Sequence, residues 1–245
     1  MDGVITRTAL VHSAAWKRMF DEYLRRRAER LGERFVEFAH ATDYLAYVDG
    51  RPRYQGVESF LNSRGIDLPP GSAEDFPDRE TICGLGNRKN AYFNQILERD
   101  GVQLFDSSIA LIREMRRRGV KIGLATSSKN SLVILKRTGA AHLFATVVDG
   151  VVSAQLGLKG KPAPDIFTTA AANLGVSNAR TIVVEDAVPG VQAGAKGGFA
   201  LVIGVAREEN ARELRANGAD LVVTDLGETN VDEISRMVRA KPSGS

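Results

Sequence analysis

The sequence has 245 residues, which is enough for one sizeable α/β domain and a small accessory domain. Hydrophobic residues make up 43% and charged residues 26%, and 33 basic against 30 acidic residues leave a net charge of +3. The arginine clusters Arg25–Arg27 and Arg116–Arg118 fall in amphipathic helical patterns, which predict solvated helix faces over nucleic-acid patches. One cysteine, Cys83, excludes an internal disulfide, and no apolar run approaches the roughly 20 residues of a membrane span. We therefore expect a cytoplasmic protein with no membrane and no nucleic-acid partner.

Residues 9–99 show a helical pattern rich in charged and aromatic side chains, without a convincing buried strand. Loops such as Asp67–Asp78, which carries three prolines and a glycine, separate the helical segments. The predicted helices are Leu10–Leu31, Thr42–Val48, Tyr54–Arg64 and Asn87–Arg99.

From about Val102 onward, short apolar runs suited to buried parallel strands alternate with amphipathic helices. The predicted strands are Lys121–Ala125, Thr146–Val148, Thr181–Val184, Ala200–Ile203 and Leu221–Val223. The predicted helices are Ser107–Arg118, Ser128–Thr138, Pro164–Leu174, Val188–Lys196, Glu208–Asn217 and Asp232–Val238. The alternation predicts an α/β fold with a doubly wound parallel sheet. We expect a core of residues 1–9 and 102–240, an inserted α-helical cap of residues 10–101, and a frayed tail, Lys241–Ser245.

Because an open parallel sheet carries its site at the carboxyl ends of the strands, the residues after each strand are the candidates. The first such segment is Thr126-Ser127-Ser128-Lys129-Asn130, whose hydroxyls and backbone N–H groups could cradle a phosphate at a helix N-terminus. Taken alone, a simple helix N-cap by Ser127 or Ser128 is the favoured interpretation.

Two further strand-end segments carry charge. Lys161 stands in Gly160-Lys161-Pro162-Ala163-Pro164-Asp165, where two prolines stiffen the loop and would fix one ammonium; the alternative is a surface lysine. Glu185 and Asp186 follow a buried strand, where two adjacent carboxylates are costly unless a cation such as Mg²⁺ neutralises them. The alternative is a helix-start pair favoured by the helix dipole. The opening Asp2-Gly3 is by itself a weak signal.

Together and in this order, these segments resemble the haloacid-dehalogenase superfamily. The four motifs are matched by Asp2-Gly3-Val4-Ile5-Thr6, by Thr126-Ser127-Ser128, by Lys161-Pro162-Ala163-Pro164-Asp165, and by Glu185-Asp186 with Gly190. Within the superfamily the sequence is most similar to the β-phosphoglucomutase subfamily. The similarity to that subfamily rests on Thr8, His12 and Trp16 after the opening motif, on Arg88-Lys89-Asn90, and on Thr126 to Asn130.

The resemblance implies a role for each matched core residue. Asp2 would be the general acid and base, and its backbone carbonyl would also bind Mg²⁺. Glu185 and Asp186 would complete the protein's share of the metal site, while Thr126 and Lys161 would hold the transferring phosphoryl group.

The resemblance also implies the residues that bind a phosphosugar substrate. From the cap, His12, Trp16 and Lys89 would close over it, and Arg53 is the candidate for gripping its distal phosphate. The sugar-phosphate pocket would be lined by Ser127, Ser128, Lys129 and Asn130.

The sequence departs from the family pattern in several places. Arg7 replaces a usual acidic residue, Arg25–Phe38 resembles an insertion in the cap, and Thr126 replaces serine. The largest departure is at the start, because the family's nucleophilic aspartate belongs two residues before Asp2. The first core strand, expected between Lys121–Ala125 and Thr181–Val184, would be largely missing with it. Each lost buried apolar residue forfeits roughly 1.5–3 kcal/mol, so we expect residues 1–245 alone to fold poorly and to be inactive.

The implied reaction is magnesium-dependent phosphoryl transfer through an aspartyl-phosphate, interconverting β-glucose 1-phosphate and glucose 6-phosphate. Lys89 and His12 favour this mutase reaction over a plain phosphatase of sugar phosphates or phosphoglycolate, which remains the alternative. A catalytically silent binding domain is a third interpretation. The resemblance further suggests a monomer that is metabolically coupled to a disaccharide phosphorylase.

Overall fold

A computed structural model of the chain describes residues 1–207 and 209–241, and these divide into two compact units. One unit combines Met1–Arg7 with the chain from Val102 onward, and we call it the α/β unit. The other is Thr8–Gly101, which we call the helical unit. Of the predicted tail, only Lys241 lies within the described residues. No helix in the described part of the chain is long and apolar enough to cross a membrane.

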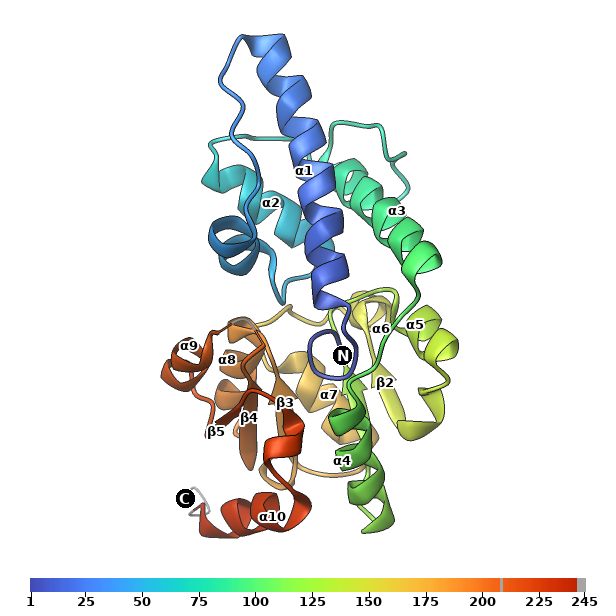
Figure 1. The fold of residues 1–245 in the computed structure, drawn as a ribbon, viewed down its shortest axis with the longest axis vertical. Coiled ribbons are helices and arrows are strands. Elements are labelled where there is room, and N and C mark those ends of the chain that lie inside the picture. The colour runs from blue at the N-terminus through green and yellow to red at the C-terminus, as the bar shows by residue number, and fades with distance from the viewer. Residues whose placement is uncertain (208, 242–245) are drawn as a thin grey trace. The chain divides into compact units, whose positions relative to one another are not determined.

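The helical unit contains the four predicted helices, and each of them starts one to five residues earlier than predicted (Figure 1). They are α1 (Ala9–Leu31), the π-helix η1 (His40–Val48), α2 (Arg53–Ser63) and α3 (Ile82–Asp100). The start of α3 lies five residues before the predicted Asn87, at a point where the Thr81 hydroxyl accepts a hydrogen bond from the Gly84 N–H at 2.9 Å. This N-cap satisfies a backbone donor that would otherwise be unpaired.

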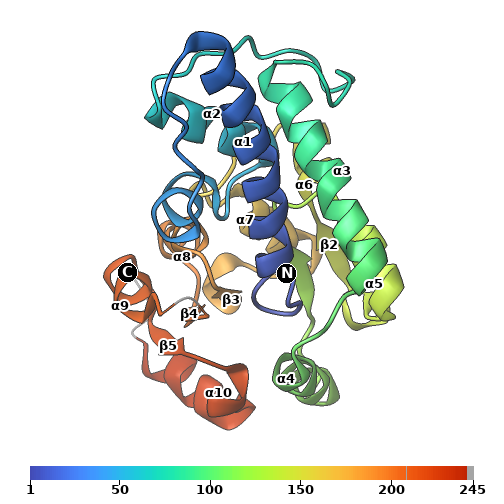
Figure 2. The same ribbon diagram turned by 45° about the horizontal axis from the view of Figure 1, so that its top comes forward.

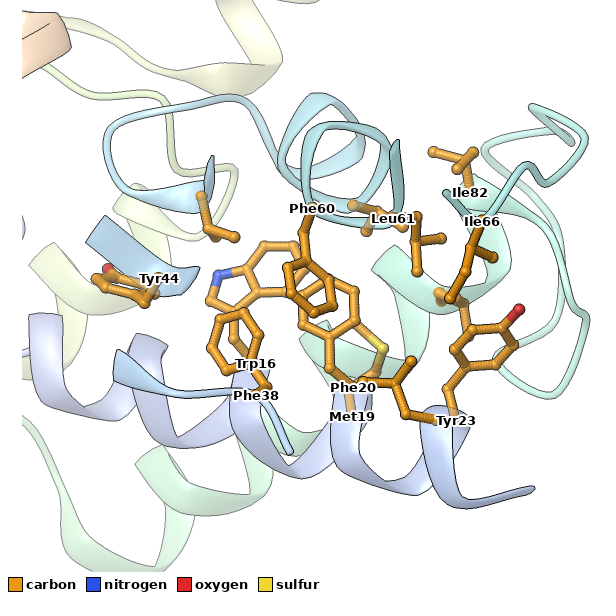
Figure 3. Close-up of a cluster of buried hydrophobic side chains, with 14 residues drawn as sticks. Trp16, Met19, Phe20, Tyr23, Phe38, Tyr44, Phe60, Leu61, Ile66 and Ile82 are labelled. Carbon is orange, nitrogen blue, oxygen red and sulfur yellow. The ribbon is translucent and has the colours of Figure 1, made fainter. Parts of the chain in front are cut away.

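An aromatic cluster forms the core of the helical unit (Figure 3). Phe20, Phe38 and Phe60 are each fully buried, and the ring centroid of Phe20 lies 5.0 Å from that of Phe38 and 4.3 Å from that of Phe60. Trp16 stacks on Phe20 at 5.3 Å. Because α1, α2 and the segment before η1 each contribute a ring, this cluster fixes the helices of the unit against one another.

The α/β unit alternates strands and helices as predicted. Its strands are β1 (Gly123–Ala125), β2 (Thr146–Val148), β3 (Ile182–Glu185), β4 (Leu201–Val205) and β5 (Leu221–Val223). Its helices are α4 (Asp106–Arg117), α5 (Ser131–Thr138), η2 (Ala141–Leu143), α6 (Gly150–Gln155), α7 (Asp165–Asn173), η3 (Asn178–Arg180), α8 (Val188–Lys196), α9 (Ala211–Ala216), η4 (Leu226–Glu228) and α10 (Val231–Ala240). The short helix α6 was not predicted, and the predicted helix start at Glu208 lies outside the described residues.

All strand pairs are parallel, as predicted, but the described strands form two sheets instead of one. In the first, β1 pairs with β2; in the second, the order is β3-β4-β5. Helix α7 packs on β1 and β2, while α8 packs on β3 and β4 (Figure 2). A single apolar cluster contains both Val148 of β2 and Val183 of β3, so the two sheets share one core. The sheet was predicted to be continuous through a strand between β1 and β3, and that strand stays a prediction.

The first seven residues form a closed loop, drawn dark blue near the N label of Figure 1. The backbone N–H groups of Ile5 and Thr6 both donate to the Met1 carbonyl, at 2.8 and 3.1 Å. Thr6 also bridges to Leu104, which anchors the loop on the segment before α4. The loop therefore holds Asp2 in the α/β unit through backbone hydrogen bonds.

Candidate active site

The carboxyl ends of the parallel strands carry the predicted polar residues of the α/β unit. Thr126 directly follows β1, and Glu185 ends β3 with Asp186 next in the chain. Three predicted polar side chains of this unit are buried: Thr126 is 4%, Glu185 4% and Lys161, which lies in the loop between α6 and α7, 6% exposed. Buried polar groups at one sheet edge are costly unless they are paired, so their partners define the site.

Asp2 lies beside Thr126. The Thr126 hydroxyl is 3.5 Å from Oδ2 of Asp2, at the outer limit of a hydrogen bond. The Asp2 loop turns at Gly3, whose φ of 67° lies in the left-handed region, and whose N–H donates to the Thr6 carbonyl at 2.9 Å. The structure thus brings together two of the predicted residues that are 124 positions apart.

Asp186 lies against the same loop. A Cβ built on Gly3 would stand 1.7 Å from Oδ2 of Asp186, so any side chain at this position would collide with that carboxylate. The missing Cβ therefore allows the Asp186 carboxylate to reach the backbone next to Asp2. Asp2, Thr126 and Asp186 therefore lie close together. Thr126 and Asp186 follow β1 and β3, as expected for residues at strand ends, whereas the place of Asp2 was predicted from the family motif.

Lys161 and Glu185 form a buried ion pair. Nζ of Lys161 is 3.0 Å from Oε1 of Glu185, and each side chain is 5% exposed. Gly190 makes room for this arrangement, since a Cβ there would stand 2.2 Å from the Glu185 carboxyl carbon. Lys161 is therefore not a surface lysine. The Lys161 ammonium neutralises the Glu185 carboxylate, a role that was predicted from the sequence for a metal cation.

The loop after β1 is held by its own side chains. The Thr126 hydroxyl accepts from the Ser128 N–H, and the Ser128 hydroxyl accepts from the Asn130 N–H, both at 3.2 Å. Helix α5 begins only at Ser131, with Asn130 as its N-cap and no side-chain cap. The interpretation of Ser127 or Ser128 as the N-cap is therefore wrong, because this turn precedes the helix. Lys129 in the same loop is exposed.

In the helical unit, His12, Trp16 and Lys89 lie together. Lys89 is 3% exposed, and its Nζ is 2.6 Å from Nδ1 of His12. The same ammonium lies 5.0 Å from the Trp16 ring centroid and 4.7 Å from that of Phe93, on which His12 stacks at 4.1 Å. Two aromatic faces and an imidazole thus help to stabilise the ammonium of this buried lysine.

Arg53 is the first residue of helix α2, and it contacts helix α3 at the residue after Lys89. Its Nη2 donates to Oδ1 of Asn90 at 2.8 Å, and Asn90 directly follows Lys89. Burial lowers the pKa of Arg53 below its ordinary value, which reports a desolvated guanidinium. A desolvated cation of this kind gains from an anionic ligand. Its predicted contact with a distal phosphate stays a prediction.

Comparisons with known proteins identify the family of the chain. The profile of the haloacid dehalogenase-like hydrolases matches residues 1–198. The chain belongs to this family. It is 47% identical over 231 residues to a β-phosphoglucomutase of Mycobacterium bovis, covering 93% of this chain and 88% of that protein. It is therefore a β-phosphoglucomutase-like enzyme of the haloacid dehalogenase family.

The chain is also similar to part of a longer protein and to a solved crystal structure. An uncharacterized glycosyl hydrolase of Mycobacterium tuberculosis is 40% identical over 231 residues, which cover 94% of this chain but 17% of that protein. The crystal structure of a β-phosphoglucomutase from Clostridium difficile has a TM-score of 0.71 at 23% identity, covering 97% of this chain and 94% of that one. The second match shows the shared fold.

The cofactor that the family implies is Mg²⁺, and the oxygen donors at the sheet edge fit it. Mg²⁺ commonly takes one or two carboxylates and completes its shell with water and phosphate oxygens. The Asp186 carboxylate lies in the space that the missing Cβ of Gly3 leaves, next to the backbone of Asp2. In the described part of the chain, no three His, Cys, Asp or Glu side chains converge. The fit therefore rests on Asp186 and the Asp2 carbonyl, while the predicted role of Glu185 as a ligand stays a prediction.

Two residues that the sequence did not predict touch these loops, Arg207 and Asn210. The Arg207 Nε donates to the Gly3 carbonyl at 3.1 Å, and the Asn210 Nδ2 donates to the Asp186 carbonyl at 3.1 Å. Both residues follow strand β4, and residues at the carboxyl end of a parallel strand are candidates for a site. They were overlooked because β4 ends in no recognised motif.

Proposed function

We propose that the protein catalyses magnesium-dependent phosphoryl transfer on a small phosphosugar, interconverting β-glucose 1-phosphate and glucose 6-phosphate. The observation that carries the proposal is the group at the sheet edge, where Asp186 lies against Gly3 next to Asp2 and Thr126. The substrate assignment is supported by the 47% identity to a β-phosphoglucomutase.

In this mechanism the chain's own residues orient the phosphoryl group and move a proton. Asp2 protonates the leaving oxygen and later takes the proton of the attacking hydroxyl. The Thr126 hydroxyl, which lies beside Asp2, and the Lys161 ammonium hold the transferring group, and Lys161 offsets its negative charge. Mg²⁺, held by Asp186 and the Asp2 carbonyl, would supply further stabilisation of developing charge. The attacking carboxylate is assigned by the family motif to the position two residues before Asp2.

The helical unit supplies the proposed preference for sugar over water as the acceptor. Lys89, His12 and Trp16 present one ammonium and two rings, which suit the hydroxyls and apolar face of a sugar. Arg53 supplies a second cation for the distal phosphate of a bisphosphate intermediate. Ser127, Ser128, Lys129 and Asn130 stay proposed as the lining of the sugar-phosphate pocket.

The test is a coupled assay with β-glucose 1-phosphate and Mg²⁺. Two forms are compared: residues 1–245, and the same chain preceded by a segment that supplies the motif's first aspartate. We expect glucose 6-phosphate from the second form and none from the first. Asp2→Asn should abolish turnover, whereas the matched control Asp67→Asn, at an exposed position of the helical unit, should not. Turnover that survives Asp2→Asn would contradict the proposal.

A phosphatase is the second candidate, and the family's description as hydrolases favours it. A phosphatase would release inorganic phosphate from the same substrate without forming glucose 6-phosphate. Lys89→Met separates the two outcomes, because losing the ammonium should raise inorganic phosphate at the expense of glucose 6-phosphate. Binding of the phosphosugar without turnover in either form would instead support a silent binding domain.

We further propose that a disaccharide phosphorylase supplies the substrate, since phosphorolysis of a glycosidic bond yields a sugar 1-phosphate. This is supported by the glycosyl hydrolase relative, in which a region similar to this chain forms part of a larger protein. Such a reaction sequence belongs in the cytoplasm, where we propose that the protein acts as a monomer.

A further inference from the structure

The segment after β4 reaches both loops of the proposed metal site. Arg207 contacts the Asp2–Gly3 loop through the Gly3 carbonyl, at 3.1 Å. Asn210 contacts the Glu185–Asp186 loop through the Asp186 carbonyl, also at 3.1 Å. Both contacts go to backbone carbonyls, so they act on the position of each loop and leave its carboxylates available. Two residues of one short segment thus connect two loops that are more than 180 positions apart in the chain.

The guanidinium of Arg207 is held from several sides. Its Nη1 donates to the Thr224 carbonyl and to Oδ2 of Asp225, both at 2.8 Å. Its Cζ lies 3.8 Å from the ring centroid of Phe105, and the side chain is 16% exposed. A planar guanidinium that is stacked on a ring and bound through Nη1 has little freedom to turn. Its Nε–H is therefore fixed in the direction of the Gly3 carbonyl.

Asp225 in turn is fixed by two further donors. The Ser107 hydroxyl, followed by the Arg207 guanidinium and the Gly227 N–H, lowers the pKa of Asp225 to about 2. The carboxylate is thus an anion that ties Arg207 to helix α4, which carries Ser107, and to η4, which carries Gly227. These elements are parts of the packed α/β unit, so Arg207 is anchored on a rigid base.

Such an anchor matters at Gly3 because the backbone there is the least restricted by its own side chain. Glycine at a φ of 67° has no Cβ to restrict the peptide that follows it, so the Gly3–Val4 peptide could rotate. The next two carbonyls are already held: the Ser108 hydroxyl donates to Val4 at 2.6 Å, and the Phe105 N–H donates to Ile5 at 2.9 Å. Arg207 supplies the corresponding donor for the Gly3 carbonyl, which is one peptide after the Asp2 carbonyl.

We propose that Arg207 and Asn210 are positioning residues that set the distance between the Asp2 carbonyl and the Asp186 carboxylate, and thereby the affinity for the divalent cation. This inference rests on the proposed function, because it takes that cation and those two ligands as given. Partners that orient metal ligands from behind commonly change metal affinity by roughly 10–100-fold when they are removed.

The test measures metal binding directly and does not depend on turnover. Mn²⁺ binding is followed by electron paramagnetic resonance on residues 1–245 and on the chain with the upstream aspartate. The variants are Arg207→Met, Arg207→Lys and Asn210→Ala. Lysine keeps the charge but lacks the planar fork that bridges Gly3, Thr224 and Asp225, so it should not restore binding fully. The matched control is Arg212→Met, at an exposed arginine of α9.

We expect Arg207→Met and Asn210→Ala each to weaken Mn²⁺ binding by roughly tenfold or more. The melting temperature and the KM for β-glucose 1-phosphate should stay near those of the parent chain, while kcat falls at limiting Mg²⁺ and recovers at high Mg²⁺. A purely structural role would lower the melting temperature without this recovery. Variants that bind Mn²⁺ as the parent does would overturn the inference and leave the proposed function intact. If neither parent form binds Mn²⁺, the proposed metal site itself is wrong, and the inference fails with it.

Discussion

The two units place their candidate residues by different physical means. In the α/β unit, Asp2 and Asp186 lie on loops whose backbone carbonyls are held by donors from other segments. In the helical unit, Lys89 and His12 project from helices and are held by aromatic packing and by each other. Backbone hydrogen bonds fix the position of a loop, whereas packing fixes the helix on which a side chain stands. Substitutions in the aromatic core of the helical unit should therefore act mainly on stability, and substitutions at the loops of the α/β unit mainly on function.

The largest effect should come from the aromatic cluster of the helical unit. Phe60→Ala removes a fully buried ring and should lower the free energy of unfolding of that unit by about 3–5 kcal/mol. Trp16, the only tryptophan of the chain, belongs to the same cluster, so its fluorescence during urea unfolding reports on this unit. Phe76→Ala is the control, since Phe76 is 74% exposed and should leave the transition unchanged. Equal effects of the two substitutions would show that the cluster does not stabilise the unit.

The buried ion pair should be the most sensitive point of the α/β unit. Lys161→Met leaves the Glu185 carboxylate buried without its cation, and breaking a buried pair in this way costs about 3–5 kcal/mol. Circular dichroism during urea unfolding measures the loss, and Lys159→Met, at an exposed neighbouring lysine, is the matched control.

A second variant separates charge from packing at this pair. Replacing both partners, with Lys161→Met and Glu185→Gln, removes the uncompensated charge and should recover much of the stability that Lys161→Met loses. Activity should remain lost in the double variant, because Lys161 is proposed to hold the phosphoryl group. If the double variant is no more stable than the single one, the lysine stabilises the unit through packing instead.

Gly3→Ala tests the idea that loop position controls function in the α/β unit. The new methyl group would stand 1.7 Å from Oδ2 of Asp186 and would also strain a backbone with a φ of 67°. Either the carboxylate or the loop must move, and a misplacement of about 1 Å commonly costs about 100-fold in rate. Turnover of β-glucose 1-phosphate by the active form measures the effect.

Gly32→Ala is a closely matched control for this substitution. Gly32 has the same φ of 67°, but a Cβ there meets nothing within 4 Å. It should therefore show the backbone strain without the collision, with a small loss of stability and unchanged turnover. A similar loss of turnover in both variants would assign the effect to backbone strain instead of the contact with Asp186.

The sequence predicts the strands and most helices of this chain because their apolar periods are clear. It fails for the first turn of α3, where Gly84 and Gly86 weaken the helical pattern. The structure explains both glycines, since a Cβ would stand 2.4 Å from the Arg79 carbonyl at Gly84 and 2.7 Å from the Tyr54 ring at Gly86. Requirements of tertiary packing thus override the local preference, and no local pattern records them.

The same limit applies to the candidate site. The expectation that polar residues at the carboxyl ends of parallel strands form the site predicts Thr126 and Asp186, because it depends on chain order and strand direction alone, whereas Asp2 was predicted from the family motif. It does not predict that Lys161 pairs with Glu185, since partners depend on side-chain directions in three dimensions. Nor does it single out Arg207, which contacts a loop about 200 positions earlier in the chain.

The smallest expected effect concerns Asp225, which anchors Arg207 in the α/β unit. Its pKa is lowered from the ordinary 3.8 to about 2, first by the Ser107 hydroxyl and then by Arg207. A lowered pKa means that the folded state favours the ionised carboxylate, so the stabilisation is complete above about pH 4 and is lost as the pH falls towards 2. The side chain is 38% exposed, and solvent screening reduces the contribution to about 1 kcal/mol or less.

The free energy of unfolding of Asp225→Asn should therefore lie slightly below that of the parent chain at neutral pH, with the difference shrinking between pH 4 and pH 2. A difference that stays constant through this range would mean that the carboxylate contributes through shape and hydrogen bonding instead of charge. Arg207 would then owe its fixed direction mainly to Phe105 and Thr224.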